Sequence, residues 1–324
     1  MSIPARRRIS FVVPCYDEEA SLPLLHEALT ALFERLEPRY EIEVVLVDDG
    51  SRDRTWSLIR DYAEKDPRFR GISLSRNFGH QAALSCGYDR ASGDAVVSLD
   101  ADLQDPPEVI LEMIEKWEAG ADVVYAVRES REGETAFKRG TAALFYRAIR
   151  ALGAGHVRAD AGDFRLLSRR ALEALRSLPE YHRFVRGMVG WIGFRTDEVR
   201  FTRPPRRAGS TKYTLRKMLG FAIDAVVSFS IVPLRLAYLA GALLCVLILG
   251  YLGYALVRFL FFGGELEPGW TSLILAVIGF GTMNLVCLGI LGEYVGRIYE
   301  QTKQRPVYLV KEASPPGSPP EGRG

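Results

Sequence analysis

The sequence of 324 residues predicts an α/β domain with a mostly parallel sheet flanked by helices, followed by two apolar helices. Three observations favour this architecture. Short β-branched runs alternate with helical patterns, polar clusters follow the predicted strands, and two long uncharged stretches lie toward the C-terminus. Strand–helix alternation is typical of a parallel sheet covered by helices on both faces.

Five apolar runs are the predicted strands, and four helical patterns separate them. The strands are expected at 9–13, 43–47, 70–74, 95–99 and 122–126, and the helices at 21–36, 54–65, 81–91 and 107–119. In such sheets a ligand binds beyond the carboxyl ends of the strands. Polar clusters at 14–18, 48–51, 75–79 and 100–102 follow those ends, so we expect the functional site there.

Two stretches without a charged residue predict a helical hairpin that crosses a bilayer. They run from Leu236 to Val257 and from Trp270 to Gly292, and each exceeds the roughly 20 residues that a membrane helix needs. A pair of buried core helices is the alternative. Basic residues flank both ends of the hairpin, whereas its turn carries Glu265 and Glu267 and no base. This imbalance predicts that both ends lie in the cytoplasm.

The predicted domain organisation has four parts. They are a soluble domain at 1–212, a juxtamembrane amphipathic helix at 213–232, the hairpin at 233–296, and a cytoplasmic tail at 297–324 that is disordered at its end. The amphipathic helix can lie on the membrane surface or pack on the soluble domain. No signal peptide is apparent, and the four cysteines lack metal-type spacing, which favours a reducing compartment for the soluble part. We therefore expect a multi-pass protein of the inner (cytoplasmic) membrane with both termini cytoplasmic.

Asp100, Asp102 and Gln104 are the predicted metal ligands. Residues two apart in an extended segment point the same way, so their three oxygens can converge. Such hard oxygens suit Mg²⁺ or Mn²⁺, which also bind substrate phosphates. A pair of aspartates alone is a weak signal. Here it follows a predicted strand and precedes a predicted helix, which favours a metal and diphosphate site.

A second polar cluster follows the first two predicted strands. The first turn lacks a G-x-G-x-x-G run, which disfavours a dinucleotide-binding fold. Glu18 and Asp49 can accept hydrogen bonds from a base or a ribose, and Tyr16 can stack on a base. The alternative is local turn stabilisation, which we prefer for Asp48.

Taken in series, five motifs make the pattern specific. They are Pro14-x-Tyr-x-Glu-Glu, Val47-Asp-Asp-Gly-Ser, Ser75-Arg-Asn-Phe-Gly, Asp100-Ala-Asp-Leu-Gln-Asp-Pro-Pro and Gly162-Asp-Phe-Arg. Over roughly residues 8–310 the chain resembles the polyprenyl-phosphate glycosyltransferases, the dolichol-phosphate mannosyltransferase-like branch of the inverting family 2 glycosyltransferases, in the bacterial type with two membrane helices. The resemblance implies a GT-A fold, a nucleoside-diphosphate sugar donor, a divalent metal and a lipid-phosphate acceptor.

Carried over residue by residue, the resemblance also implies roles for individual side chains. It implies metal ligation by Asp100, Asp102 and Gln104, nucleotide contacts by Pro14, Tyr16, Glu18 and Asp49, diphosphate contacts by Arg206 and Lys212, and a catalytic base at Asp163. The base role has an alternative. A phosphate monoester has a second pKa of about 6, so the acceptor hardly needs a strong base. Asp163 can instead orient the acceptor or accept hydrogen bonds from sugar hydroxyls. If the base role holds, Asp163→Asn nearly abolishes turnover.

The basic residues before the hairpin fit two anionic substrates. Seven basic residues and no acid lie between Arg200 and Lys217. A donor diphosphate and an acceptor phosphate must meet in one site, and arginine and lysine bind such groups. Arg216 and Lys217 can instead contact anionic lipid. Arg183 and Arg186 are weaker candidates for the acceptor phosphate.

The expected function is inverting transfer of a hexose-type sugar from a nucleoside-diphosphate sugar, with uridine as the preferred base, to polyprenyl phosphate on the cytoplasmic face. Three alternatives stand beside it. A mannosyltransferase would use GDP-mannose, a processive polysaccharide synthase would carry a Q-x-x-R-W run that is missing from the sequence, and a membrane module would bind nucleotide-sugar or lipid without catalysis. No nucleic-acid partner is expected, and the resemblance implies a homotetramer.

Overall fold

The computed structural model describes residues 6–128, 161–202, 227, 230–262 and 269–315. The expected diphosphate ligands Arg206 and Lys212, and nearly all of the expected amphipathic helix, lie outside these residues.

The described residues form an eight-stranded sheet in the order β7-β5-β6-β4-β1-β2-β3-β8. The strands are β1 (Arg7–Cys15), β2 (Tyr40–Asp48), β3 (Phe69–Leu74), β4 (Ala95–Ser98), β5 (Val123–Arg128), β6 (Ala161–Ser168), β7 (Thr196–Phe201) and β8 (Val310–Ser314). β1 runs parallel to β2 and β4, β2 to β3, and β5 to β7. β6 is antiparallel to β4 and β5, and β8 is antiparallel to β3.

Helices cover both faces of this sheet. They are α1 (Leu22–Leu36), α2 (Thr55–Lys65), α3 (His80–Arg90), α4 (Val109–Glu118), α6 (Arg169–Ser177) and α7 (Val185–Trp191). Successive strand residues point to opposite faces, so Phe11 and Val13 join the core under α1, α2 and α4. Val12, between them, joins the core under α3, α6 and α7. The predicted mostly parallel sheet with flanking helices is confirmed.

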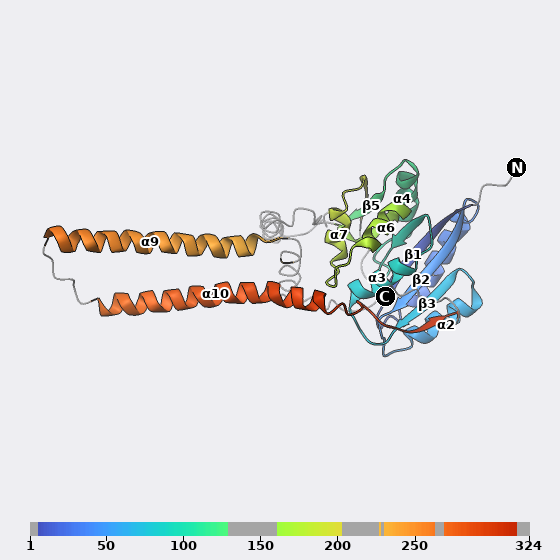
Figure 1. The fold of residues 1–324 in the computed structure, drawn as a ribbon. Coiled ribbons are helices and arrows are strands. Elements are labelled where there is room, and N and C mark those ends of the chain that lie inside the picture. The colour runs from blue at the N-terminus through green and yellow to red at the C-terminus, as the bar shows by residue number, and fades with distance from the viewer. Residues whose placement is uncertain (1–5, 129–160, 203–226, 228–229, 263–268, 316–324) are drawn as a thin grey trace.

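Two long apolar helices form a hairpin that extends from this domain: α9 (Val232–Phe262) and α10 (Trp270–Thr302) (Figure 1). Both are candidate membrane spans by length and composition, and none of their most apolar windows is buried within the protein. Exposed apolar surface of this extent needs a cover, which a bilayer supplies. The alternative of buried core helices is therefore excluded for the described chain.

The structure adds three strands that the sequence did not predict, β6, β7 and β8, and β8 comes from the expected tail. The expected division placed residues after 296 in a tail, but α10 continues to Thr302 and β8 then pairs with β3. Without β8, β3 would expose the unpaired backbone groups of an edge strand. The sheet of the N-terminal domain therefore includes five residues from beyond the hairpin.

Candidate active site

Polar loops meet at the carboxyl ends of β1, β2, β3 and β4, as the parallel sheet predicts. The loop after β2 packs closely on the loop after β3 at Gly50, whose φ is +69°. A Cβ atom at this position would lie 2.5 Å from the backbone carbon of Arg76. Glycine therefore allows two of the site's loops to touch.

The turn that carries the expected metal ligands is held by local hydrogen bonds. The amide of Asp100 donates to Asp105 Oδ2 (3.2 Å), and the amide of Gln104 donates to Asp102 Oδ1 (3.1 Å). Between them Leu103 adopts a φ of 56°, a left-handed conformation that is uncommon for such residues. Strained backbone of this kind clusters at functional sites, because only surrounding structure maintains it.

The residues of this turn fit a divalent cation. Gln104 is 3% exposed, and its Oε1 atom has no hydrogen-bond partner among the described residues. Burial, together with the nearby Asp163 and Asp102 carboxylates, raises the pKa of Asp100, although His80 and Arg186 act against the shift. A divalent ion would satisfy the amide oxygen and offset the concentrated negative charge. No cluster of three His, Cys, Asp or Glu side chains arranged for a metal occurs in the described residues. Metal ligation by Asp100, Asp102 and Gln104 stays a prediction.

The register of β6 brings Asp163 to the turn that carries Asp100, Asp102 and Gln104. β6 runs antiparallel to β4 with Ser98 opposite Arg165, so two residues further along Asp163 comes opposite Asp100. The Ser98 hydroxyl donates to the backbone oxygen of Asp163 at 2.5 Å. The expected catalytic residue and the first expected metal ligand therefore lie beside each other, although 63 positions separate them in the sequence.

The carboxylate of Asp163 is surrounded by hydrogen-bonding groups. Oδ1 accepts from Arg165 (2.6 Å) and from Arg186 Nε (3.1 Å). Oδ2 accepts from Arg186 (2.9 Å) and Gln81 (3.3 Å), and His80 Nε2 lies 3.2 Å away. Burial favours a high pKa for Asp163, but His80, Arg186 and Arg165 outweigh it and hold the pKa well below its ordinary value. An ionised carboxylate with its oxygens occupied is a weak proton acceptor.

His80 and Gln81 are site residues that the sequence reasoning missed. His80 Nε2 lies between two carboxylates, 3.2 Å from Asp163 and 3.8 Å from Asp100. Burial acts to lower the pKa of His80, but these carboxylates raise it above its ordinary value. Gln81 also accepts a hydrogen bond from the amide of Val185 (3.0 Å), which ties the start of α7 to Asp163. Their position directly after the Ser75–Gly79 motif was the available signal.

The two arginines expected at the acceptor phosphate lie in different surroundings. Arg186 binds Asp163, whereas Arg183 donates to the backbone oxygen of Leu178 (3.1 Å) and lies 3.9 Å from Asp89. The structure therefore brings Arg186 into the site, whereas Arg183 lies near the C-terminal end of α3.

The expected nucleotide-binding residues follow β1 and β2. Pro14 is buried, Tyr16 is exposed, and Glu18 accepts a hydrogen bond from the Ser21 hydroxyl. Asp49 accepts from the amides of Phe78 (2.7 Å) and Gly79 (2.9 Å) through its two oxygens, and burial raises its pKa. Asp48 accepts from Ser51 and Ser73, which fits the local structural role preferred for it. The nucleotide contacts expected of Pro14, Tyr16, Glu18 and Asp49 stay predictions.

Comparison with known proteins decides the family. The glycosyl transferase family 2 model matches residues 10–176, which contain both aspartates of the turn and Asp163. The chain belongs to glycosyltransferase family 2. It is 45% identical to the glycosyltransferase YkcC of Bacillus subtilis, over 94% of this chain and 93% of that protein. It is 40% identical to the prophage-derived bactoprenol glucosyl transferase of Shigella flexneri, over 94% and 98% of the two chains, and 39% identical to an Escherichia coli homolog over the same shares.

These relatives confirm the resemblance drawn from the motifs. Among solved structures, this family 2 glycosyltransferase aligns with glucosyl-3-phosphoglycerate synthase of Mycobacterium tuberculosis at 20% identity. That alignment covers 68% of this chain and 76% of the other, with a TM-score of 0.49.

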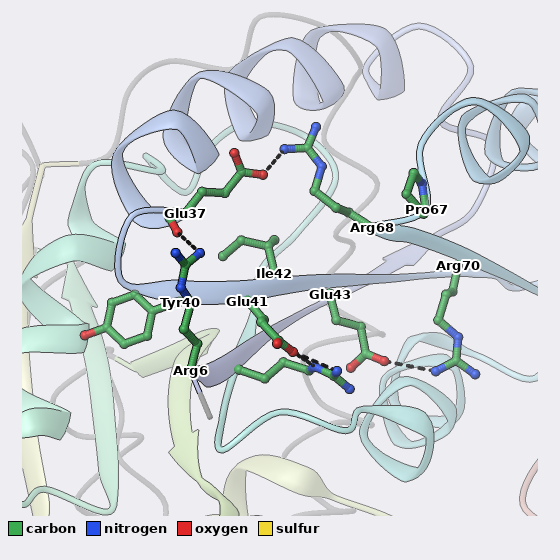
Figure 2. A pocket seen from close by; sticks show the side chains of 10 residues that line it. Arg6, Glu37, Tyr40, Glu41, Ile42, Glu43, Pro67, Arg68 and Arg70 are labelled. Atoms are coloured by element: carbon green, nitrogen blue, oxygen red, sulfur yellow. Dashed lines mark hydrogen bonds and ion pairs between the residues drawn. The ribbon is translucent and has the colours of Figure 1, made fainter. Parts of the chain in front are cut away.

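A pocket of about 620 Å³ lies at the other end of the glycosyltransferase sheet, at the starts of β1, β2 and β3 (Figure 2). Three of its four arginines pair with acidic side chains of the same pocket: Arg8 with Glu41, Arg68 with Glu37, and Arg70 with Glu43. The fourth, Arg6, donates to the backbone oxygen of Glu37 (3.2 Å). Because these charges compensate each other, the pocket is poorly suited to an anionic substrate. We assign the chemistry to the strand ends instead.

Proposed function

We propose that the chain transfers a hexose-type sugar from a nucleoside-diphosphate sugar, with uridine as the expected base, to polyprenyl phosphate. The product is a polyprenyl-phosphate sugar with inverted anomeric configuration, made on the cytoplasmic face of the inner membrane. One observation carries the proposal: relatives named bactoprenol glucosyl transferases match 94% of this chain, so the likeness extends beyond the family domain to the apolar hairpin.

Asp100, Asp102 and Gln104 would hold a divalent ion, Mg²⁺ or Mn²⁺. The unpartnered amide oxygen of Gln104 and the raised pKa of Asp100 support this assignment. When bound, such an ion offsets the negative charge of the departing diphosphate. Arg206 and Lys212 remain the expected additional diphosphate contacts.

In the reaction, an oxygen of the acceptor phosphate forms a bond to the anomeric carbon of the sugar. The bond from that carbon to the donor's diphosphate breaks, and the nucleoside diphosphate leaves with the bonding electrons. Because the acceptor has a second pKa of about 6, much of it is already a dianion at neutral pH. No strong base is needed, so we assign Asp163 an orienting role, which its occupied oxygens and lowered pKa support.

Arg186 is the residue that we assign to the acceptor phosphate. Asp163 holds its guanidinium at two points, and 31% of its side chain is exposed at the strand ends. A guanidinium held in this way is preorganised to meet an anion. The remaining role of Asp163 is then to fix the direction in which Arg186 points.

The candidate membrane helices suit a lipid acceptor, because they would keep the domain where the acceptor's phosphate lies. The homotetramer implied by the resemblance stays a prediction.

Release of the nucleoside diphosphate tests the proposal against a binding module. With full-length protein in detergent, a labelled donor and a short-chain polyprenyl phosphate, we expect release that depends on acceptor and metal. A module that binds donor without catalysis would release none, and this result would contradict the proposal.

A further inference from the structure

The chain segment that follows the membrane hairpin contacts the catalytic domain at three places. We call residues 300–314, from the end of α10 through β8, the C-terminal clamp. It binds the loop before α7, the end of α3, and the edge of the sheet at β3. Figure 1 shows this segment passing from the hairpin along the domain.

The first contact is made by one side chain, Gln301. Its Oε1 atom accepts a hydrogen bond from the amide of Tyr181 (2.7 Å), and its Nε2 atom donates to the backbone oxygen of Pro179 (2.8 Å). Next to it Glu300 pairs with His182 at 2.5 Å. Both side chains are exposed, and such surface ion pairs contribute little to stability. Gln301 therefore satisfies two backbone groups of this loop, one donor and one acceptor.

The other two contacts continue along the domain. The Tyr308 hydroxyl donates to Asp89 on α3 (2.9 Å), and the backbone oxygen of Leu309 accepts from the amide of Ser75 (2.8 Å). β8 then pairs with β3, and Trp56 donates from its ring nitrogen to Glu312 (3.2 Å). Because the contacts lie at separate points, they restrict both the rotation of the catalytic domain relative to the hairpin and its movement away from the hairpin.

The end of α10 projects past the start of α9. The Tyr294 hydroxyl donates to the backbone oxygen of Ser230 (2.6 Å), so the start of α9 lies beside Tyr294. The eight residues from 295 to 302 continue as helix beyond this level. At 1.5 Å per residue they extend about 12 Å toward the domain. The clamp therefore begins on a continuous helix that extends toward the domain.

The first contact of the clamp lies next to the site, because Gln301 binds the loop before α7. The start of β1 lies on the side away from the hairpin (Figure 1), so the strand ends lie nearer to it. The loop that Gln301 binds leads directly into α7, where Arg186 contacts Asp163. A lipid phosphate stays at the membrane surface, so the site must be held at the right height and angle to reach it.

We propose that the C-terminal clamp, through Gln301, fixes the height and orientation of the catalytic domain over the bilayer. Gln301 is then a positioning residue for the membrane-embedded acceptor, distant from the reacting atoms. This inference rests on the proposed function, because it needs a lipid-phosphate acceptor.

The test compares two acceptors in one preparation of the full-length protein in lipid vesicles. One is a long-chain polyprenyl phosphate in the bilayer, and the other is a short-chain, water-soluble polyprenyl phosphate. For Gln301→Ala we expect kcat/KM with the bilayer acceptor to fall about tenfold, the loss expected for two hydrogen bonds, while transfer to the soluble acceptor stays within about twofold. Thr302→Ala is the matched control, because the hydrogen bond that the Thr302 hydroxyl makes among the described residues stays within α10, to the backbone oxygen of Ile298 (2.7 Å). It should leave both rates unchanged.

A conservative variant strengthens the test. Gln301→Glu keeps an acceptor for the Tyr181 amide but loses the donor to Pro179, so its bilayer rate should lie between those of wild type and Gln301→Ala. Equal losses with both acceptors, or no loss with either, would overturn the inference while leaving the proposed function in place. A wild-type protein that transfers sugar to neither acceptor would overturn the proposed function, and this inference with it.

Discussion

Arg186 binds Asp163 through two of its nitrogens, with Nε 3.1 Å from Oδ1 and a terminal nitrogen 2.9 Å from Oδ2. This paired contact joins α7 to the start of β6, next to the turn that carries Asp100 and Asp102. The contact fixes the direction of the arginine side chain and uses both carboxylate oxygens of the aspartate as hydrogen-bond acceptors. It supports two proposed roles: Arg186 binds the acceptor phosphate, and Asp163 orients Arg186.

Arg186→Ala should weaken use of the acceptor more than Arg183→Ala does. Loss of a charge-assisted hydrogen bond costs about 1.5–3 kcal/mol, so kcat/KM for the acceptor should fall about 10- to 150-fold. Arg183 contacts Leu178 and Asp89, and its removal should leave the KM for the acceptor close to that of wild type. Steady-state kinetics with varied acceptor measure this. A larger rise in acceptor KM for Arg183→Ala would reverse the assignment.

The pH dependence of transfer should follow the acceptor and not Asp163. We expect kcat/KM to rise as pH increases through about 6, where the lipid phosphate becomes a dianion, and then to level off. Asp163 has its pKa well below the ordinary value, so it is ionised throughout this range. Asp163→Asn should therefore lower the rate at every pH without moving the midpoint. The midpoint does not depend on the amount of folded protein, so loss of stability leaves it unaffected.

A phosphonate acceptor makes this comparison sharper. Its second pKa is higher than that of a phosphate ester, so the midpoint should move to higher pH with wild-type protein. A midpoint that stays in place with the phosphonate, or disappears in Asp163→Asn, would favour a base role for Asp163.

Asp102→Ala should remove metal-dependent turnover without unfolding the domain. Because a bound ion supplies several kcal/mol of stabilisation to the departing group, the rate should fall about a hundredfold or more. Glu108→Ala is the control, since Glu108 is exposed and lies six residues further along the chain. The assignment of Asp102 as a metal ligand is tested by treating each protein with a chelator and measuring its rate after Mg²⁺ or Mn²⁺ is added. The Tm of each variant shows whether its domain is still folded. Near-normal rates in Asp102→Ala would contradict it.

Glu43 should stabilise the domain at neutral pH and lose this effect in acid. Burial acts to raise its pKa, but hydrogen bonds from Ser10, Ser92 and Arg70 outweigh it and lower the pKa below its ordinary value. A lowered pKa in the folded state stabilises the protein above the unfolded value of about 4.3, and the effect disappears as pH falls through the folded value.

Glu43→Gln should therefore lower the free energy of unfolding by about 1.5–3 kcal/mol at pH 7. The difference from wild type should narrow below about pH 4.3. Denaturant unfolding across this range measures it, and a difference independent of pH would contradict the prediction. Transfer rates at pH 7 should be unchanged, because Glu43 lies near the start of β2, away from the site.

The sequence predicted the elements whose apolar residues follow a regular local pattern, continuous in the strands and at helical spacing in the helices. β1 to β5 and α1 to α4 lie within a few residues of their expected positions. β6 was missed because it buries two charged residues of its own, Asp163 and Arg165, which pair with each other and interrupt the apolar pattern of a strand. β8 was missed because it is a short edge strand, and its pairing with β3 depends on where α10 ends.

The site residues divide in the same way, into those that a local motif predicts and those whose role depends on a distant partner. Asp100, Asp102, Gln104, Asp163 and Arg186 were predicted from local motifs and the resemblance, and the structure brings Asp163 and Arg186 to the turn. His80 and Gln81 directly follow the Ser75–Gly79 motif, but their role depends on a carboxylate more than 80 positions away, so the motif alone could not assign it. Gln301 is further still from the loop that it binds.

The lipid product tests the central claim most directly. Full-length protein, Mg²⁺ or Mn²⁺, a short polyprenyl phosphate and a panel of nucleoside-diphosphate sugars should yield one new lipid, identified by mass and NMR. We predict a sugar joined at its anomeric carbon to the lipid's single phosphate, in the configuration opposite to the donor's, with release of nucleoside diphosphate. A diphosphate-linked sugar lipid with release of nucleoside monophosphate, or no sugar lipid from any donor that binds, would contradict the account.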